Sequence, residues 1–148
     1  MQKKLNNKGF TIVEVLIVLA IAGAILAAIL LAVPALQTNA KNAQLKTAAN
    51  DVVAAISNST ATNNGAIPGT GTITYTAPTL KVAGSTTNLP AQITTVTEVT
   101  SDGTASINTI YVSLFGCNTA GTGFNATSSG TWGVEYYPPN GTKTCISA

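Results

Sequence analysis

The chain has 148 residues, 45% hydrophobic and only 8% charged, with seven Lys, no Arg, no His, five acidic residues and two Cys. The absence of His and Arg excludes a Ser-His-Asp triad, a His-based metal site and an Arg phosphate clamp, and a net charge of +2 provides no basic surface for nucleic acid. Its mean hydropathy of +0.32 excludes an intrinsically disordered chain, which combines low hydrophobicity with high net charge.

The N-terminal region consists of a short basic segment followed by a long apolar run. Residues 1–9 read MQKKLNNKG and contain three Lys and no acid, and residues 15–36 carry no charge. As a helix, residues 15–36 would be about 33 Å long, enough to cross a hydrocarbon core of about 30 Å. The positive-inside rule keeps the Lys-rich end in the cytoplasm. We therefore predict a single-pass segment in the cytoplasmic membrane, with the following residues outside.

Three kinds of segment compete to explain this region. A secretory signal peptide has an apolar core of about 7–15 residues, shorter than the run seen here. A plain signal anchor explains the length and the orientation, but it gives no reason for the carboxylate of Glu14 at the start of the run. The third explanation comes from the residues at the junction, Lys8-Gly9-Phe10-Thr11-Ile12-Val13-Glu14.

This junction resembles the N-terminal segment of type IV prepilins, and the resemblance covers residues 3–36. In that family a basic leader ends in Gly, the next residue is usually Phe, and a Glu lies four residues further on. Gly9, Phe10 and Glu14 occupy these positions. The resemblance implies that residues 1–9 are a class III signal peptide, removed by a prepilin peptidase that cleaves after Gly9. It also implies N-methylation of Phe10.

The carboxylate of Glu14 is costly at the edge of a membrane helix. One interpretation is that Glu14 lies near the interface and its side chain reaches water. The alternative follows from the resemblance: in a filament, Glu14 pairs with the cationic N-terminus of Phe10 on a neighbouring subunit. Phe10, Thr11 and Glu14 are then the assembly residues. An unpaired charge in a dry filament core costs several kcal/mol, so such a pair would also set the register.

The helical pattern continues beyond the apolar run. Residues 10–36 are expected to form the hydrophobic membrane and filament-core helix, and residues 37–61 its amphipathic outer half. The apolar residues of that outer half lie on one helical face, which predicts a helix from about Phe10 to about Ser59. These residues are Leu45, Ala49, Val52, Val53 and Ile56.

Gly23 and Pro34 interrupt the helical pattern. Pro34 lacks an N–H and crowds the preceding turn, and Gly23 lowers helix propensity. In membrane helices both residues are often packing features only. The resemblance implies a second role, since filaments of this family can melt the helix between such positions. We therefore predict a kink or a melted stretch between Gly23 and Pro34.

Residues 62–148 form a Thr-rich region in which short β-type runs alternate with turn residues; residues 60–148 contain 21 of the 24 Thr. We predict strands over 72–76, 79–83, 92–100, 105–115, 131–137 and 143–146. An antiparallel sheet laid on the outer half of the helix would bury the apolar faces of both. The predicted fold class is α+β: the pilin fold, with a long N-terminal helix packed against a small antiparallel β-sheet head.

Cys117 and Cys145 both follow the membrane segment, so both are expected outside the cytoplasm, where a disulfide persists. Two free thiols remain the alternative, and the resemblance implies a C-terminal disulfide at these positions. Between them, Trp132, Tyr136 and Tyr137 form either an exposed contact patch or, with Val134, a strand whose period-two face is buried. Period two favours the buried face of Trp132, Val134 and Tyr136.

The preferred function is a structural subunit of a type IV pilus, which is a homo-oligomeric helical filament, or fimbrium. The resemblance implies two kinds of partner, the prepilin peptidase and methyltransferase and the pilus assembly machinery in the membrane. It also implies that the precursor is stored in the membrane and that the mature subunit is part of an extracellular pilus. The family's roles include twitching motility, cell adhesion, DNA uptake and conjugation. We expect no enzyme, no cofactor and no metal site, and no nucleic-acid binding through a basic patch.

Alternatives are a pseudopilin of a type II-like secretion system and a membrane-anchored adhesion module. Major pseudopilins commonly bind calcium through acidic residues near the C-terminus. Here Glu135 is the only acidic residue between the two Cys, which favours a pilin. Hydrolysis by paired carboxylates would need two of Glu98, Asp102 and Glu135 in one cleft.

Overall fold

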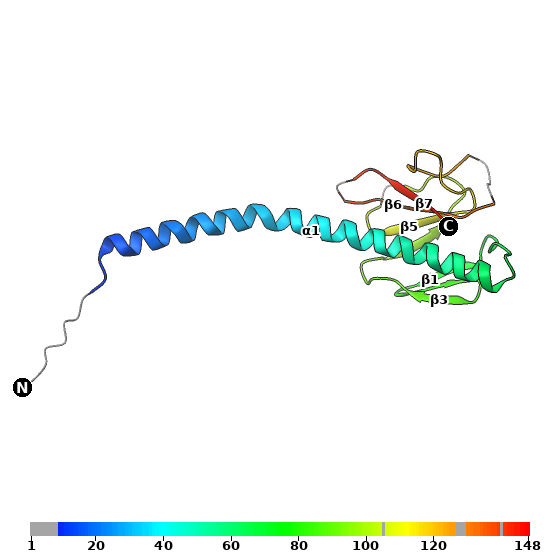
Figure 1. Ribbon diagram of the computed structural model, residues 1–148, viewed down its shortest axis with the longest axis horizontal. Helices are drawn as coiled ribbons and strands as arrows, with labels where there is room; N and C mark the ends of the chain where they lie inside the picture. The colour runs from blue at the N-terminus through cyan, green and yellow to red at the C-terminus, as the bar shows by residue number, and fades with distance from the viewer. Residues whose placement is uncertain (1–8, 105, 127–129, 140) are drawn as a thin grey trace, which may run out of the picture. The chain divides into compact units, whose positions relative to one another are not determined.

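The computed structural model describes residues 9–104, 106–126, 130–139 and 141–148. The chain divides into two compact units, residues 1–37 and 38–148. The basic leader residues Lys3, Lys4 and Lys8 lie outside the described residues. The described elements are α1 (Ile12–Thr62), β1 (Ile73–Thr76), β2 (Thr79–Val82), β3 (Ser85–Asn88), β4 (Thr95–Glu98), β5 (Thr109–Ser113), β6 (Gly133–Tyr136) and β7 (Thr144–Ser147) (Figure 1).

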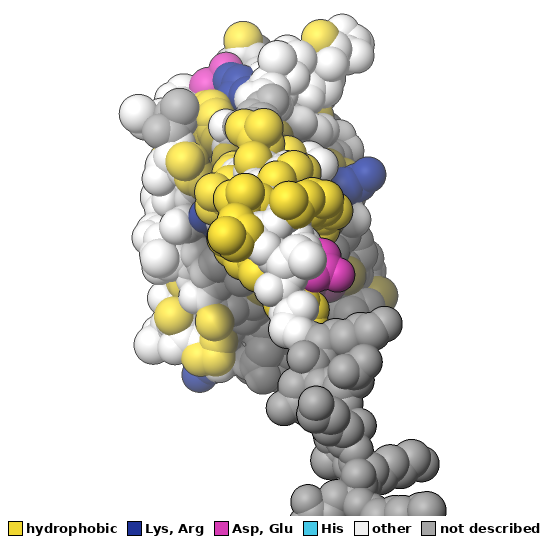
Figure 2. Space-filling view, turned by 90° about the vertical axis from the view of Figure 1, so that its left-hand side faces the viewer, with side chains coloured by type: hydrophobic (Ala, Val, Ile, Leu, Met, Phe, Trp, Pro, Cys, Tyr) yellow, Lys and Arg dark blue, Asp and Glu magenta, His cyan; other side chains and the backbone are white. Residues whose placement is uncertain are grey.

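The first unit contains the N-terminal part of α1. Its apolar side chains are exposed, from Phe10 at 89% to Leu36 at 67%, and this part of the helix is long and apolar enough to cross a membrane. Figure 2, in which this end of the chain faces the viewer, shows hydrophobic side chains gathered over it. The helix continues through Gly23 and Pro34 in the subunit. Melting of this stretch in a filament stays a prediction.

The second unit contains the C-terminal part of α1, which is amphipathic as predicted. Its buried residues recur every three or four positions and include four of the five predicted, whereas Val53 is only half-buried. The buried residues are Leu45, Ala48, Ala49, Val52, Ala55, Ile56 and Ser59. The helix begins two residues after the predicted start and ends at Thr62, three residues beyond the predicted end.

Asn64 and Gly65 terminate α1. Both have positive φ, 54° and 81°, a conformation that Asn and Gly tolerate best. The N–H of Gly65 donates to the carbonyl of Thr60 at 2.9 Å, which satisfies one of the helix's last carbonyls. The chain then turns back along the helix toward the strands.

The strands form two sheets rather than the single antiparallel sheet that was predicted. The first sheet has the order β1-β2-β3 and is antiparallel; the second has the order β4-β5-β6-β7. Within the second sheet, β4 pairs with β5 in parallel, and the other two pairs are antiparallel. The parallel β4–β5 pair departs from the predicted antiparallel sheet, because two parallel strands cannot be joined by a hairpin.

Strand β3 was missed by the prediction. Its four residues, Ser-Thr-Thr-Asn, contain no apolar side chain, so hydrophobic alternation cannot reveal them. The tight turn before β3 explains why it forms. Ala83 and Gly84 both have positive φ, 45° and 93°, and they reverse the chain so that Val82 pairs with Ser85.

Both sheets contribute to one core against α1. The side chains buried there come from the helix face, from the first sheet and its following loop, and from alternate positions of β5 and β6. The predicted buried face of Trp132, Val134 and Tyr136 is confirmed, with exposures of 1%, 0% and 5%. The indole N–H of Trp132 donates to the carbonyl of Pro68 at 3.0 Å, so its polar atom is satisfied inside the core. The α+β fold class is confirmed.

Candidate functional site

Thr11 and Glu14 cap the N-terminus of α1. The backbone N–H and the hydroxyl of Thr11 donate to Oε2 of Glu14 at 2.8 and 2.9 Å. In return, the N–H of Glu14 donates to Oγ1 of Thr11 at 3.3 Å. This reciprocal arrangement is a capping box, with Thr11 at the N-cap and Glu14 at the third helical position. The carboxylate also lies at the positive end of the helix dipole.

Gly9 and Phe10 lie just before this cap, outside the helix and exposed to solvent. A Cβ added at Gly9 would meet no other atom within 4 Å. Packing among the described residues therefore gives no reason for glycine at this position.

No described residue of the first unit covers the apolar helix that follows Glu14. Its side chains are exposed on all faces rather than along one stripe, which is the pattern of a helix surrounded by lipid or by other helices. Gly23 has open space around its Cβ position, so no side chain of the described subunit requires a glycine there. The structure thus brings Thr11 and Glu14 together and places Gly23 and Pro34 further along the same helix.

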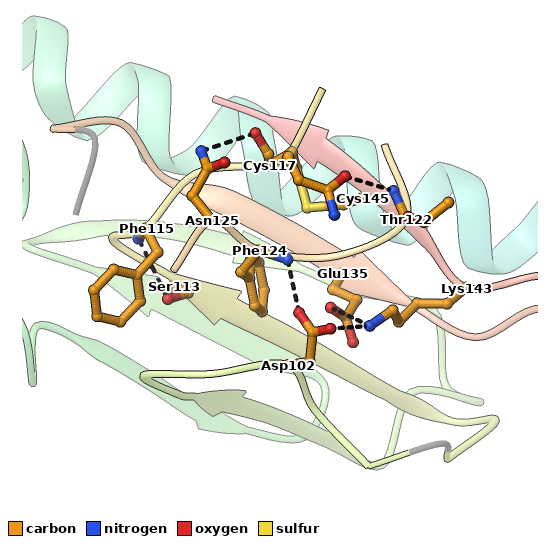
Figure 3. Close-up of a disulfide and its surroundings, with 11 residues drawn as sticks. Asp102, Ser113, Phe115, Cys117, Thr122, Phe124, Asn125, Glu135, Lys143 and Cys145 are labelled. Carbon is orange, nitrogen blue, oxygen red and sulfur yellow. Dashed lines mark hydrogen bonds and ion pairs between the residues drawn. A yellow bond between two sulfur atoms is a disulfide. The ribbon is translucent and has the colours of Figure 1, made fainter. Parts of the chain in front are cut away.

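A second polar site lies on the four-stranded sheet, on the face opposite α1. Cys117 and Cys145 form a disulfide there, with an S–S distance of 2.02 Å and a Cα–Cα distance of 5.6 Å. Cys145 on β7 pairs across the sheet with Glu135 on β6, which in turn pairs with Tyr111 on β5. The loop that carries Cys117 and Phe124 covers this face (Figure 3).

This covering loop is fastened along the outer side of β7. The N–H of Cys145 donates to the carbonyl of Gly121 at 2.8 Å. The amide of Asn125 donates to the carbonyl of Cys117 at 3.0 Å. The loop therefore has backbone and side-chain contacts in addition to the disulfide.

Three charged residues meet beneath this loop: Asp102, Glu135 and Lys143 (Figure 3). Nζ of Lys143 forms an ion pair with Oδ2 of Asp102 and lies 3.7 Å from Oε2 of Glu135. Oδ1 of Asp102 accepts the N–H of Phe124 at 2.7 Å. The side chain of Glu135 is completely buried, whereas that of Asp102 is half exposed.

The three charges have different environments. Burial raises the pKa of the Glu135 carboxyl, although the Tyr137 hydroxyl and the Lys143 ammonium act in the opposite direction. The hydrogen bond from Lys143, together with that from the Phe124 N–H, lowers the pKa of Asp102. Neither carboxylate oxygen of Glu135 accepts a well-formed hydrogen bond from the described residues.

Two tyrosines and two glycines shape this site. Tyr111 and Tyr137 pack edge to face with ring centroids 6.1 Å apart. The hydroxyl of Tyr137 donates to the carbonyl of Gly103. A Cβ at Gly103 would collide with the ring of Tyr111, and one at Gly123 would lie 2.7 Å from the Asp102 carboxylate. The glycines therefore let both loops approach the sheet closely.

Sequence reasoning did not identify this cluster. It noted Glu98, Asp102 and Glu135 only as candidates for paired acids, and the structure brings together Asp102 and Glu135. Glu98 accepts the N–H of Gly71 at 2.8 Å instead. Within the described residues, no group of three or more His, Cys, Asp or Glu side chains is arranged to hold a metal ion. The sequence offered one signal for this cluster: alternation along the strand places Glu135 on the face opposite the buried Val134 and Tyr136.

The comparisons with known proteins bear on the N-terminal site. A family model described as the prokaryotic N-terminal methylation motif matches residues 4–30, which include Gly9, Phe10 and Glu14. No curated protein and no solved structure matches the chain. The motif implies processing by a prepilin peptidase and handling by membrane assembly machinery. The match supports a class III signal peptide and a type IV pilin-like N-terminal segment, which pilins and pseudopilins share.

Proposed function

We propose that this chain is a structural, non-enzymatic subunit of a type IV pilus filament. The observation that carries the proposal is the capped carboxylate of Glu14 at the start of an apolar helix that no described residue of its unit covers. Such a helix requires lipid before assembly and other helices after it. In a helical homo-oligomer, the exposed apolar side chains of each copy would be covered by those of its neighbours.

Cleavage after Gly9 would create the second charge that the filament needs. The peptide nitrogen of Phe10 becomes a cationic amine, and N-methylation leaves its charge in place. A carboxylate offers about four acceptor positions, so Glu14 can accept this amine from a neighbouring subunit while it retains the two hydrogen bonds from Thr11. The pairing would place two opposite charges in a dry interior, where only a matched register avoids an uncompensated charge.

The proposed roles of the segments follow from this chemistry. Residues 1–9 orient the precursor in the cytoplasmic membrane and are then removed, residues 10–36 form the filament core, and residues 37–61 join the core to the displayed head, 62–148. Removal of three of the seven Lys leaves four Lys against five acids. The side chains of the extracellular form therefore have a slight negative charge, and a basic nucleic-acid surface is not part of its function.

The alternative is a pseudopilin, which shares this N-terminal segment. The C-terminal cluster supports the pilin role, because Lys143 lies between Asp102 and Glu135. The Lys143 ammonium thus balances the two carboxylates, which is the role that a calcium ion would have at an acidic C-terminal site of a pseudopilin. A membrane-anchored adhesion module is the third candidate, and it would leave the apolar helix in the membrane permanently.

The test is the mass of the main component of fibres sheared from cells that express the chain. A pilin gives fibres built from this chain, beginning at Phe10 and carrying one additional methyl group. Gly9→Ala should leave the precursor uncleaved, whereas the matched control Gly69→Ala on the head should be processed normally. Glu14→Ala should be cleaved but assemble poorly. Fibres that retain residues 1–9, or that consist mainly of another chain, would contradict the proposal.

A further inference from the structure

The cluster of Asp102, Glu135 and Lys143 combines the groups needed to make an amide bond between side chains. An amine donor, Lys143 Nζ, contacts the carboxylate oxygen Oδ2 of Asp102, although the two residues are 41 positions apart in the chain. The second carboxylate, Glu135, lies 3.7 Å from the same nitrogen. Figure 3 shows both carboxylates directed toward the Lys143 ammonium.

The carboxylate of Asp102 is held with its two oxygens in different environments. Oδ1 accepts the N–H of Phe124 at 2.7 Å, whereas Oδ2 faces Lys143. A backbone N–H directed at Oδ1 would stabilise the negative charge that forms on this oxygen when a nucleophile attacks Cγ. Oδ2 is then the oxygen that leaves. The half-exposed Asp102 side chain gives a released water a path to solvent.

Glu135 is placed to move protons between the reacting atoms. Its side chain is fully buried beneath the loop, and its carboxylate oxygens accept no well-formed hydrogen bond from the described residues. A buried carboxylate with unused acceptor capacity accepts a proton readily, because the neutral acid is the form that burial favours. Within the described residues, such an unsatisfied buried group calls for a physical explanation.

We propose that Asp102 and Lys143 become joined by an intramolecular amide bond, with Glu135 as the proton-transfer residue. The Lys143 ammonium first passes a proton to Oδ2 of Asp102, which gives a neutral amine and a carboxylic acid. Nζ then attacks Cγ. Glu135 takes a second proton from the nitrogen and delivers it to the hydroxyl group at Oδ2, which leaves as water. The C–O bond breaks, the C–N bond forms, and Glu135 returns to its starting state. No oxidant or other co-reactant is needed.

The environments of the two carboxyl groups have opposite effects on the reaction rate. The lowered pKa of Asp102 opposes the first proton transfer, and the burial of Glu135 favours the second. Folding must bring the three side chains together before the reaction starts, so the bond forms after folding. The proposal concerns the head only, and it does not depend on whether the chain forms a filament.

The test is the intact mass of the full chain after unfolding and reduction of the disulfide. The wild-type mass should be lower than the sequence mass by one water, either after purification or after prolonged incubation of the folded protein. Proteolysis should yield a branched peptide that joins the segments around Asp102 and Lys143. A full sequence mass that persists through the incubation would overturn the proposal.

Controls must separate this amide from a cyclic imide at the Asp102-Gly103 pair, because imide formation also removes one water. Lys143→Arg retains the positive charge but cannot form the amide, so its mass should equal the full sequence mass. A water loss that persists in Lys143→Arg would assign the change to the imide and overturn the proposal. The amide should also resist cleavage by hydroxylamine, which opens cyclic imides.

Two further variants test the roles of the carboxyl groups. Glu135→Gln preserves the size of the side chain but removes its ability to exchange protons, so the mass change should disappear or slow at least tenfold. Asp102→Asn should lose ammonia instead of water and give the same final product as the wild type. If Glu135→Gln forms the bond at the wild-type rate, the role assigned to Glu135 is wrong.

Discussion

The Oε2 atom of Glu14 accepts two hydrogen bonds from Thr11, at 2.8 Å from its backbone N–H and 2.9 Å from its hydroxyl. The carboxylate is therefore oriented by its own subunit before any partner arrives. A group held in its bound conformation loses less entropy when the partner binds. The capping box thus stabilises the helix start and prepares the proposed assembly contact with the same atoms.

This double role predicts different effects for two substitutions at the helix start. Glu14→Gln preserves an acceptor for the capping box but removes the negative charge. We expect the precursor to be cleaved normally, whereas the yield of sheared fibres should fall at least tenfold. Thr11→Ala removes the capping hydroxyl and should destabilise the helix start by about 0.5–2 kcal/mol, with a smaller loss of fibres. Fibre mass per cell measures both, and Thr11→Ser is the control that retains the hydroxyl.

The disulfide between Cys117 and Cys145 should contribute measurably to the stability of the head, since it closes a loop with a sequence separation of 28. A disulfide that closes a loop of this size typically stabilises the folded state by about 2–4 kcal/mol, chiefly because it restricts the unfolded chain. Replacement of both Cys by Ser should lower the free energy of unfolding by that amount in chemical denaturation. Reduction of the wild-type chain should reproduce the loss, and unchanged midpoints in both cases would contradict the prediction.

Glu135 should make the stability of the head depend on pH. Its folded pKa is raised above the ordinary value of 4.5, so its stabilising contribution is complete below that value and is lost as the pH rises through the raised pKa. Between these two pKa values, the free energy of unfolding should fall with increasing pH. The comparison is best made in the Lys143→Arg background, in which no amide bond with Asp102 can form.

In that background, Glu135→Gln should abolish the fall. Asp102 provides the internal contrast, because its pKa is lowered from an ordinary value of 3.8. Its contribution is present above that value and is lost only as the pH decreases below it. Denaturation midpoints measured from acid to neutral pH separate the two windows. A pH profile that Glu135→Gln leaves unchanged would show that this carboxyl does not control it.

Gly103 should tolerate no side chain, because its added Cβ would collide with the ring of Tyr111. Gly103→Ala must displace the ring or the loop, and overpacking of this kind costs about 1–3 kcal/mol. Gly69→Ala is the matched control, since no atom lies within 4 Å of a Cβ at that position. Thermal unfolding of the two variants should differ clearly, and equal midpoints would rule out close packing at Gly103.

Periodicity predicted the helix and its buried face well, because the apolar residues from Leu45 to Ile56 repeat with the period of a helix. It also identified the core face of Trp132 and Val134. It could not assign strand partners or their direction, since parallel and antiparallel strands share the period of two. Periodicity therefore could not predict that β4 and β5 pair in parallel. It could not reveal β3 either, because that strand has no apolar side chain.

The same limit explains why the cluster around Lys143 was missed. Alternation correctly places Glu135 on the face opposite Val134, and in an antiparallel sheet with one packed face the other face commonly meets solvent. The structure covers it with a loop that begins at Cys117, so a charged residue is buried where the pattern predicts exposure. Contacts between residues as distant in sequence as Asp102 and Lys143 depend on the loop's path, which no local pattern encodes. The N-terminal site was readable because its residues are consecutive.

β7 is one of the two edge strands of its sheet, and its Cys145 N–H already donates to the carbonyl of Gly121 in the covering loop. An open strand edge would offer its backbone groups to any similar edge nearby, and the sheets of separate molecules would then fuse. In the proposed fibre, identical heads stand at very high local concentration, which makes such fusion a constant hazard. The loop and its disulfide protect this edge from pairing with the same edge of a neighbouring head.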